Sequence, residues 1–180
     1  NWSHLYLDGQ DWLDKPHLPF WAAAISFKIF GINAFAYKLP SFICFLAGIY
    51  YTRKLAFLLF NNKVLAAIST ILYGTALHTV LANYDVRAEG YLTAFVCAAT
   101  FYLLKVMHHK SWRNILLAAL FCAFAVMTKG IFIFIIIFAG FVLHWLLTKR
   151  WKQFINPAWY WVALFAFIFI PAMLRMKVSE

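Results

Sequence analysis

The chain contains 180 residues, of which 65% are hydrophobic and only 12% are charged. Soluble domains are roughly half apolar and about a quarter charged, and a soluble fold of this length cannot cover so much apolar surface. These proportions exclude a soluble domain and predict an integral membrane protein. The formal net charge of +10 does not indicate nucleic-acid binding, because the basic residues recur in short groups at the ends of apolar runs rather than in one stripe.

The first 38 residues are the most polar part of the chain. Asp8, Asp11 and Asp14 precede an apolar run over residues 16–32. Seventeen residues form a helix of roughly 25 Å, which is shorter than the ~30 Å hydrocarbon core of a bilayer. We therefore expect residues 1–38 to form an outer-face loop followed by a helix that lies at the membrane interface.

Residues 39–180 are predicted to form about six transmembrane helices, so the fold class is an all-α integral membrane protein. The sequence begins without Met in a polar segment, which predicts that these helices make up one incomplete membrane domain of a longer protein. The stretch after Asn114 is too long for one span and is divided at Lys129. The candidate spans are 39–60, 64–84, 90–107, 114–128, 130–148 and 153–174.

The orientation follows from where the charges fall when these spans are threaded alternately across a bilayer. The loops 53–63, 105–113 and 148–152 then share one side and contain nine basic residues and no acid. The opposite side contains seven basic residues and all six acids. The positive-inside rule makes the first side cytoplasmic, so we expect a multi-pass protein of the plasma (inner) membrane with its acids facing outward.

Lys129 is the first charge that topology does not explain. The apolar run before it has only 15 residues, or about 22 Å as a helix, which places Lys129 below the outer surface. Ionisable groups at such a depth are costly and indicate a functional site. The alternative is a lysine in a turn that snorkels to the interface beside Gly130.

Asp85, Arg87 and Glu89 form a second group, with charges at alternate positions between two spans. In an extended segment, alternate side chains share a face, so two carboxylates and a guanidinium would point into the same space. A solvated loop with a local ion pair is the alternative.

Asp14 and Lys15 form a third group, just before the Pro16–His17–Leu18–Pro19 step. The two prolines stiffen the chain where it meets the membrane and would hold Lys15 at the depth of lipid phosphate. An ordinary interface anchor is the alternative. Taken together, the three groups predict an outward-facing cavity. Its cationic side chains would bind an anionic group, and its carboxylates would serve in polar contacts or proton transfer.

The same positions carry a family resemblance. The stretch from Trp2 to Trp21 resembles the first outer loop of the dolichyl-phosphate-mannose-protein mannosyltransferase-like family, which belongs to the glycosyltransferase C superfamily and includes the bacterial lipid A aminoarabinose transferases. Its acidic residue, lysine and proline step read here as Asp14-Lys15-Pro16, with His17 in place of a second proline. Three further segments resemble the family in the same order: 26–41, 85–95 and 127–130.

The resemblance implies an enzyme that takes a sugar from a polyprenyl-phosphate carrier on the outer face and gives it to a lipid, glycan or protein acceptor. By motif position, Lys15 would contact the carrier phosphate, with Asp14 beside it, and Arg87 and Lys129 would also bind the substrate. Asp85 and Glu89 would be supporting catalytic carboxylates. The family's principal acidic motif follows its first transmembrane helix, so the main general base is expected upstream of Asn1.

No metal or other cofactor is predicted, because the three cysteines lie within apolar runs without zinc-ligand spacing. The expected partners are the lipid-linked sugar donor, the acceptor and membrane lipids. A transporter or flippase module for an anionic lipid-linked substrate is the alternative function, with Asp85, Arg87, Glu89 and Lys129 along its pathway. Transporters commonly contain internal repeats, and this sequence contains none. A noncatalytic membrane subunit or lipid-binding scaffold is the third possibility.

Overall fold

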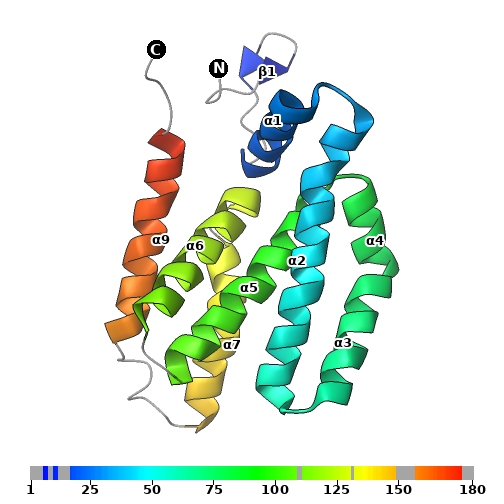
Figure 1. Cartoon of the computed structure of the whole chain (residues 1–180). Coiled ribbons are helices and arrows are strands. Elements are labelled where there is room, and N and C mark those ends of the chain that lie inside the picture. Colours follow the sequence, from blue (N-terminus) through cyan, green and yellow to red (C-terminus); the bar gives the residue numbers. More distant parts are fainter. Residues whose placement is uncertain are drawn as a thin grey trace.

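The structure is a computed structural model that describes residues 6–7, 10–11, 17–108, 111–130, 132–148 and 157–175. A two-residue antiparallel pair, β1 (Tyr6–Leu7) and β2 (Gln10–Asp11), precedes a bundle of helices. The helices are α1 (Leu18–Phe30), α2 (Ala34–Phe60), α3 (Lys63–Thr75), α4 (Leu77–Tyr84), α5 (Ala88–His108), α6 (Trp112–Lys129), α7 (Ile133–Thr148) and α9 (Pro157–Arg175) (Figure 1).

The predicted all-α membrane fold is confirmed, and each of the six candidate spans is occupied by helix. By length and apolarity, α2, α5 and α6 can each cross a membrane. The α3–α4 pair meets the same criterion as one span bent by 49°. Shorter apolar helices are α1, α7 and the Ala158–Phe169 part of α9.

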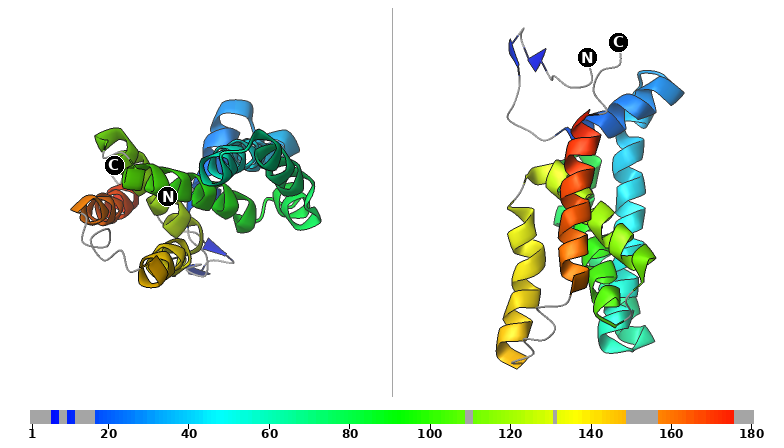
Figure 2. Two further views of the ribbon diagram at one scale, coloured as in Figure 1. Left: turned by 90° about the horizontal axis from the view of Figure 1, so that it is seen from below. Right: turned by 90° about the vertical axis from the view of Figure 1, so that its left-hand side faces the viewer.

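The long helices run alternately up and down, so the bundle has two distinct ends (Figure 1). The α2–α3 turn, the end of α5 and the end of α7 lie at one end. The α4–α5 turn and the end of α6 lie at the other, where α1 is tilted against the start of α2 (Figure 2). We call this second end the α1 end.

Small residues bring α5 and α6 together at the centre of the bundle. Ala98 and Ala99 of α5 and Ala118, Ala119 and Cys122 of α6 are all fully buried. Small side chains allow helix backbones to approach closely and gain dispersion contacts, which is the main source of helix association in a bilayer. α2 packs on the other side of α5, and α9 packs on α6.

Asparagine caps and positive-φ glycines set several helix boundaries. Asn33 accepts a hydrogen bond from the Ala36 N–H at 2.8 Å, so α2 begins before Lys38 and includes Pro40 within it. Asn62 accepts bonds from the N–H groups of Val64 and Leu65 at the start of α3. Gly130 ends α6 with φ of 100°, a conformation that favours glycine.

Candidate functional site at the α1 end

The corner between α4 and α5 is a tight turn and not the extended segment that the alternating charges suggested. The Val86 N–H donates to the Asn83 carbonyl at 3.3 Å, and the Arg87 N–H donates to the Ala82 carbonyl at 2.8 Å. This pair of bonds is the Schellman arrangement that satisfies the last carbonyls of a helix. The turn forms because those carbonyls need donors, and it directs Asp85, Arg87 and Glu89 differently from an extended strand.

Val86 occupies the left-handed position of this turn, with φ of 55°. Glycine is usual there, because a side chain that branches at Cβ collides with the backbone at positive φ. A strained residue of this kind persists only where the surrounding contacts hold it, and such residues concentrate at functional sites. Contacts around the turn therefore offset the conformational free energy that the left-handed backbone of Val86 costs.

Asp85 and Arg87 pair with each other across this turn. The Asp85 Oδ2 atom accepts bonds from Nε of Arg87 at 3.1 Å and from Nη2 at 2.7 Å. The Arg87 side chain is 59% exposed and that of Asp85 is 40% exposed, so the pair adds little to stability. Arg87 has five N–H donors and uses two of them on Asp85, which leaves donors for an approaching anion.

Glu89 and Lys129 form the second ion pair, and it connects two helices. The Lys129 Nζ donates to Glu89 Oε1 at 2.7 Å (residues on the facing ends of α5 and α6). Glu89 lies in the first turn of α5 and Lys129 in the last turn of α6, where the helix dipoles favour a negative and a positive charge respectively. Both side chains remain more than one-third exposed, so other groups can still reach them.

Asn83, Ser41 and Gly90 hold the corner against α2. The Ser41 hydroxyl donates to the Asn83 side-chain oxygen at 3.1 Å, and the Asn83 amide donates to the Thr79 carbonyl at 2.7 Å. A Cβ atom on Gly90 would lie 2.6 Å from the Asn83 side-chain oxygen, so only glycine fits there without a shift. Nothing in the sequence marks these residues as part of the site except the glycine directly after Glu89.

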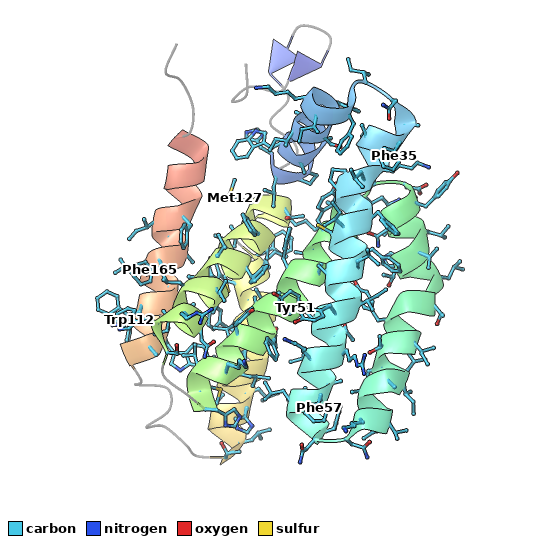
Figure 3. The ribbon with its side chains drawn as sticks, viewed as in Figure 1. Phe35, Tyr51, Phe57, Trp112, Met127 and Phe165 are labelled. Carbon is cyan, nitrogen blue, oxygen red and sulfur yellow. The ribbon has the colours of Figure 1, made fainter. Side chains whose placement is uncertain are left out.

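The predicted site residues Asp14 and Lys15 lie outside the described residues. The chain is described again from His17, whose ring stacks on Trp21 with centroids 6.0 Å apart. α1 follows at once, packs on α2 and also contacts α6. Met127, two residues before Lys129, lies at the end of α6 that faces α1 (Figure 3).

Three buried polar atoms at the α1 end have no hydrogen-bond partner among the described residues. They are Nδ1 of His17, Oγ of Ser26 and the hydroxyl of Tyr91. Buried polar atoms are nearly always paired, so each of these is a place where a further polar group would be accommodated. The described residues contain no cluster of three His, Cys, Asp or Glu side chains that could hold a metal ion.

Comparison with known proteins decides the family. The model of the dolichyl-phosphate-mannose-protein mannosyltransferase family matches residues 14–174. The chain belongs to this family. The matched region includes Lys15, both ion pairs and all of the described helices except the last residue of α9.

A curated relative and a solved structure agree with this assignment. The chain is 27% identical over 158 residues to the undecaprenyl phosphate-alpha-4-amino-4-deoxy-L-arabinose arabinosyl transferase of Enterobacter sp. (strain 638), covering 85% of this chain and 28% of that protein. The crystal structure of ArnT from Cupriavidus metallidurans in the apo state matches 96% of this chain and 34% of its own, with a TM-score of 0.75 at 15% identity. The likeness to ArnT shows the same membrane fold, and the chain spans about a third of either protein's length.

Proposed function

We propose that this chain is part of a membrane glycosyltransferase that moves a sugar from a polyprenyl-phosphate carrier to an acceptor at the outer face of the plasma (inner) membrane. Family membership supports the reaction class. The name of the Enterobacter relative specifies an undecaprenyl-phosphate-linked amino sugar. We infer a donor of the same general kind, a sugar on a polyprenyl phosphate.

The observation that carries the proposal is the ion pair between Glu89 and Lys129. It joins two segments that each resemble the family, although they lie on different helices. The second pair, Asp85 with Arg87, lies in the adjoining turn. Basic and acidic groups thus occur together at the α1 end. Lys15 precedes the first residue of α1 by three positions in the sequence.

The chemistry requires both kinds of group. An acceptor oxygen or nitrogen attacks the anomeric carbon, the bond from that carbon to the carrier phosphate oxygen breaks, and its electron pair remains on the phosphate. Cations that stabilise the departing phosphate lower the barrier, and Lys15, Arg87 and Lys129 would supply them, with Asp14 beside Lys15.

The acceptor must also lose a proton as the new bond forms. A carboxylate is the natural base, and we assign the main one to the part of the protein upstream of Asn1. Glu89 would then position Lys129, and Asp85 would position Arg87, so that both cations face the phosphate. The hydroxyls of Tyr91 and Ser26, which have no hydrogen-bond partner among the described residues, are suited to sugar hydroxyl groups.

The orientation of the site rests on the charge distribution. The end that holds the α2–α3 turn is rich in Lys and Arg, which favours the cytoplasm, so the α1 end would face outward. A lipid-linked sugar presented in the outer leaflet would then reach Lys15 and Lys129 from the membrane.

The test is sugar transfer by the full-length protein in vesicles that contain a radiolabelled polyprenyl-phosphate sugar. Glu89→Gln and Lys129→Gln should each reduce the transfer rate more than tenfold, while Lys28→Gln on the exposed face of α1 should leave it within about twofold. Carrier-linked sugar that crosses the bilayer without forming a product would instead support the transporter alternative.

A further inference from the structure

A basic groove lies at the end of the bundle away from α1, where the α2–α3 turn is found. Its volume is about 650 Å³, and it is lined by α2, the turn after it, the start of α3 and the end of α5. Phe57, on its α2 wall, marks its position near the lower end of the bundle (Figure 3). Four cationic side chains line it: Arg53, Lys54, Lys63 and Lys105.

These four cations have no carboxylate to pair with among the described residues. Between residues 15 and 179 the sequence contains only two acids, Asp85 and Glu89. Both lie at the α1 end, and both are already engaged in ion pairs there. The groove therefore carries an uncompensated positive charge.

Two of the cations are held over aromatic rings. The Lys54 Nζ lies 4.6 Å from the Tyr50 ring centre and 5.8 Å from that of Phe101, and the Lys105 Nζ lies 5.1 Å from the Phe101 ring centre. Phe101 is 5% exposed, so a buried ring of α5 draws together ammonium groups from two helices. Cation–π contacts of this kind fix the position of an ammonium group without neutralising it.

The level of the groove along the bundle favours an anionic headgroup as its occupant. Arg53 and Lys54 come seven and six residues before Phe60, the last residue of α2. Along the helix axis this separation is roughly 10 Å. With 27 residues, α2 is roughly 40 Å long and exceeds the ~30 Å hydrocarbon core. The two cations thus lie near the level of lipid headgroups. The positive-inside rule accounts for how many cations occur at this end, but not for their convergence on one cavity.

We propose that this groove binds the phosphate of an anionic phospholipid from the leaflet at this end of the bundle. Lysine ammonium groups bind phosphate as point charges, and Arg53 can bind two of its oxygens. Phe57, Leu58 and Ala66 line the same groove and supply an apolar wall for an acyl chain. This pairing of cations with an apolar wall fits an amphiphile better than a free anion, and basic pockets between transmembrane helices bind lipid headgroups in the same way. The site is independent of sugar transfer, because it lies at the opposite end of the bundle.

Native mass spectrometry of the full-length protein tests the proposal with two lipids that share dioleoyl chains, phosphatidylglycerol and phosphatidylcholine. The protein should retain phosphatidylglycerol more than tenfold better. Lys54→Gln and Lys105→Gln should each weaken that retention about fivefold, which corresponds to the ~1 kcal/mol that a basic residue contributes near an anionic membrane. Arg113→Gln is the matched control, because Arg113 is an exposed cation in the first turn of α6, at the same end of the bundle but outside the groove.

Two further measurements keep the result clear if a glutamine variant fails to fold. Lys105→Arg retains the charge and should bind as the parent protein does, and higher ionic strength should weaken the retention of phosphatidylglycerol only. Equal retention of both lipids, or an equal effect of Arg113→Gln, would overturn the proposal. Displacement of the lipid by inorganic phosphate would identify a free-anion site, and stronger retention of polyprenyl phosphate would identify a carrier site. Either result would overturn the assignment to a phospholipid.

Discussion

Glu89 and Lys129 are separated by forty positions in the chain and form an ion pair of 2.7 Å. The pair is possible because small residues bring α5 and α6 side by side. The first turn of α5 then lies next to the last turn of α6. An ion pair with both partners more than one-third exposed contributes at most about 1 kcal/mol to stability. Its position, and not its strength, is what makes it of interest for function.

A double-mutant cycle on this pair separates its two possible contributions. Glu89→Gln and Lys129→Gln should each lower the free energy of unfolding in detergent by no more than about 1 kcal/mol. The double variant should lose little more transfer activity than either single variant, because each change disables the same unit. Fully additive losses of activity, measured with the polyprenyl-phosphate sugar, would show that the two residues act separately.

Lys15→Ala in the full-length protein should sharply reduce sugar transfer, since the removed ammonium group is assigned to the carrier phosphate. Lys28→Ala removes a cation thirteen residues further along, on the exposed face of α1, and should leave the rate nearly unchanged. Initial rates at several donor concentrations are the measurement. Near-normal transfer by the Lys15 variant would exclude its phosphate role.

Cysteine labelling tests the orientation. In a background with Cys44, Cys97 and Cys122 replaced by alanine, a cysteine at Lys63 should be shielded from an impermeant reagent added outside intact cells. A cysteine at Asp85 should react, because the turn that carries it lies at the opposite end of the bundle (Figure 1). The reverse labelling pattern would invert the topology and place the Glu89–Lys129 pair in the cytoplasm.

Val86→Gly should stabilise the protein by about 1 kcal/mol, because glycine adopts the left-handed conformation of this turn without a collision at Cβ. Val80→Gly is the matched control. It lies within α4 on an exposed face, so the same change should destabilise through loss of helix propensity. Thermal unfolding of the two variants in one detergent should shift in opposite directions, and a shared direction would contradict the strain at Val86.

The sequence predicted the helices well because apolarity alone determines which segments can enter a bilayer. All six candidate spans contain helix, and the run over residues 16–32 contains α1. The boundaries were less accurate. α2 begins at Ala34, since Asn33 caps it, and Lys38 therefore lies inside the helix and not before it. The bend at Ala76 is not predicted, because no proline marks the break and a glycine such as Gly74 is common within transmembrane helices.

Both ion pairs join residues that the sequence singles out, but only the local pair in the 85–89 segment was among the expected contacts. Lys129 is singled out because charge at its depth is costly, Glu89 because it belongs to the alternating charges of residues 85–89, and threading places both at one end. Their pairing depends on which helices are neighbours, and the apolar composition of α5 and α6 does not specify that. Asp14 and Lys15 lie outside the described residues, so their part in the site remains a prediction.

The bend between α3 and α4 has a consequence for the charged corner. Tyr73, just before the bend, packs against Gly48 of α2 and its hydroxyl lies 3.2 Å from that of Thr93 on α5. Asn83, beyond the bend, accepts a hydrogen bond from Ser41 of α2 and packs closely against Gly90 of α5. The bent span is thus in contact with α2 and α5 on both sides of the bend. These contacts set the height of Asp85, Arg87 and Glu89 along the bundle, and therefore the depth at which the three side chains would meet a membrane.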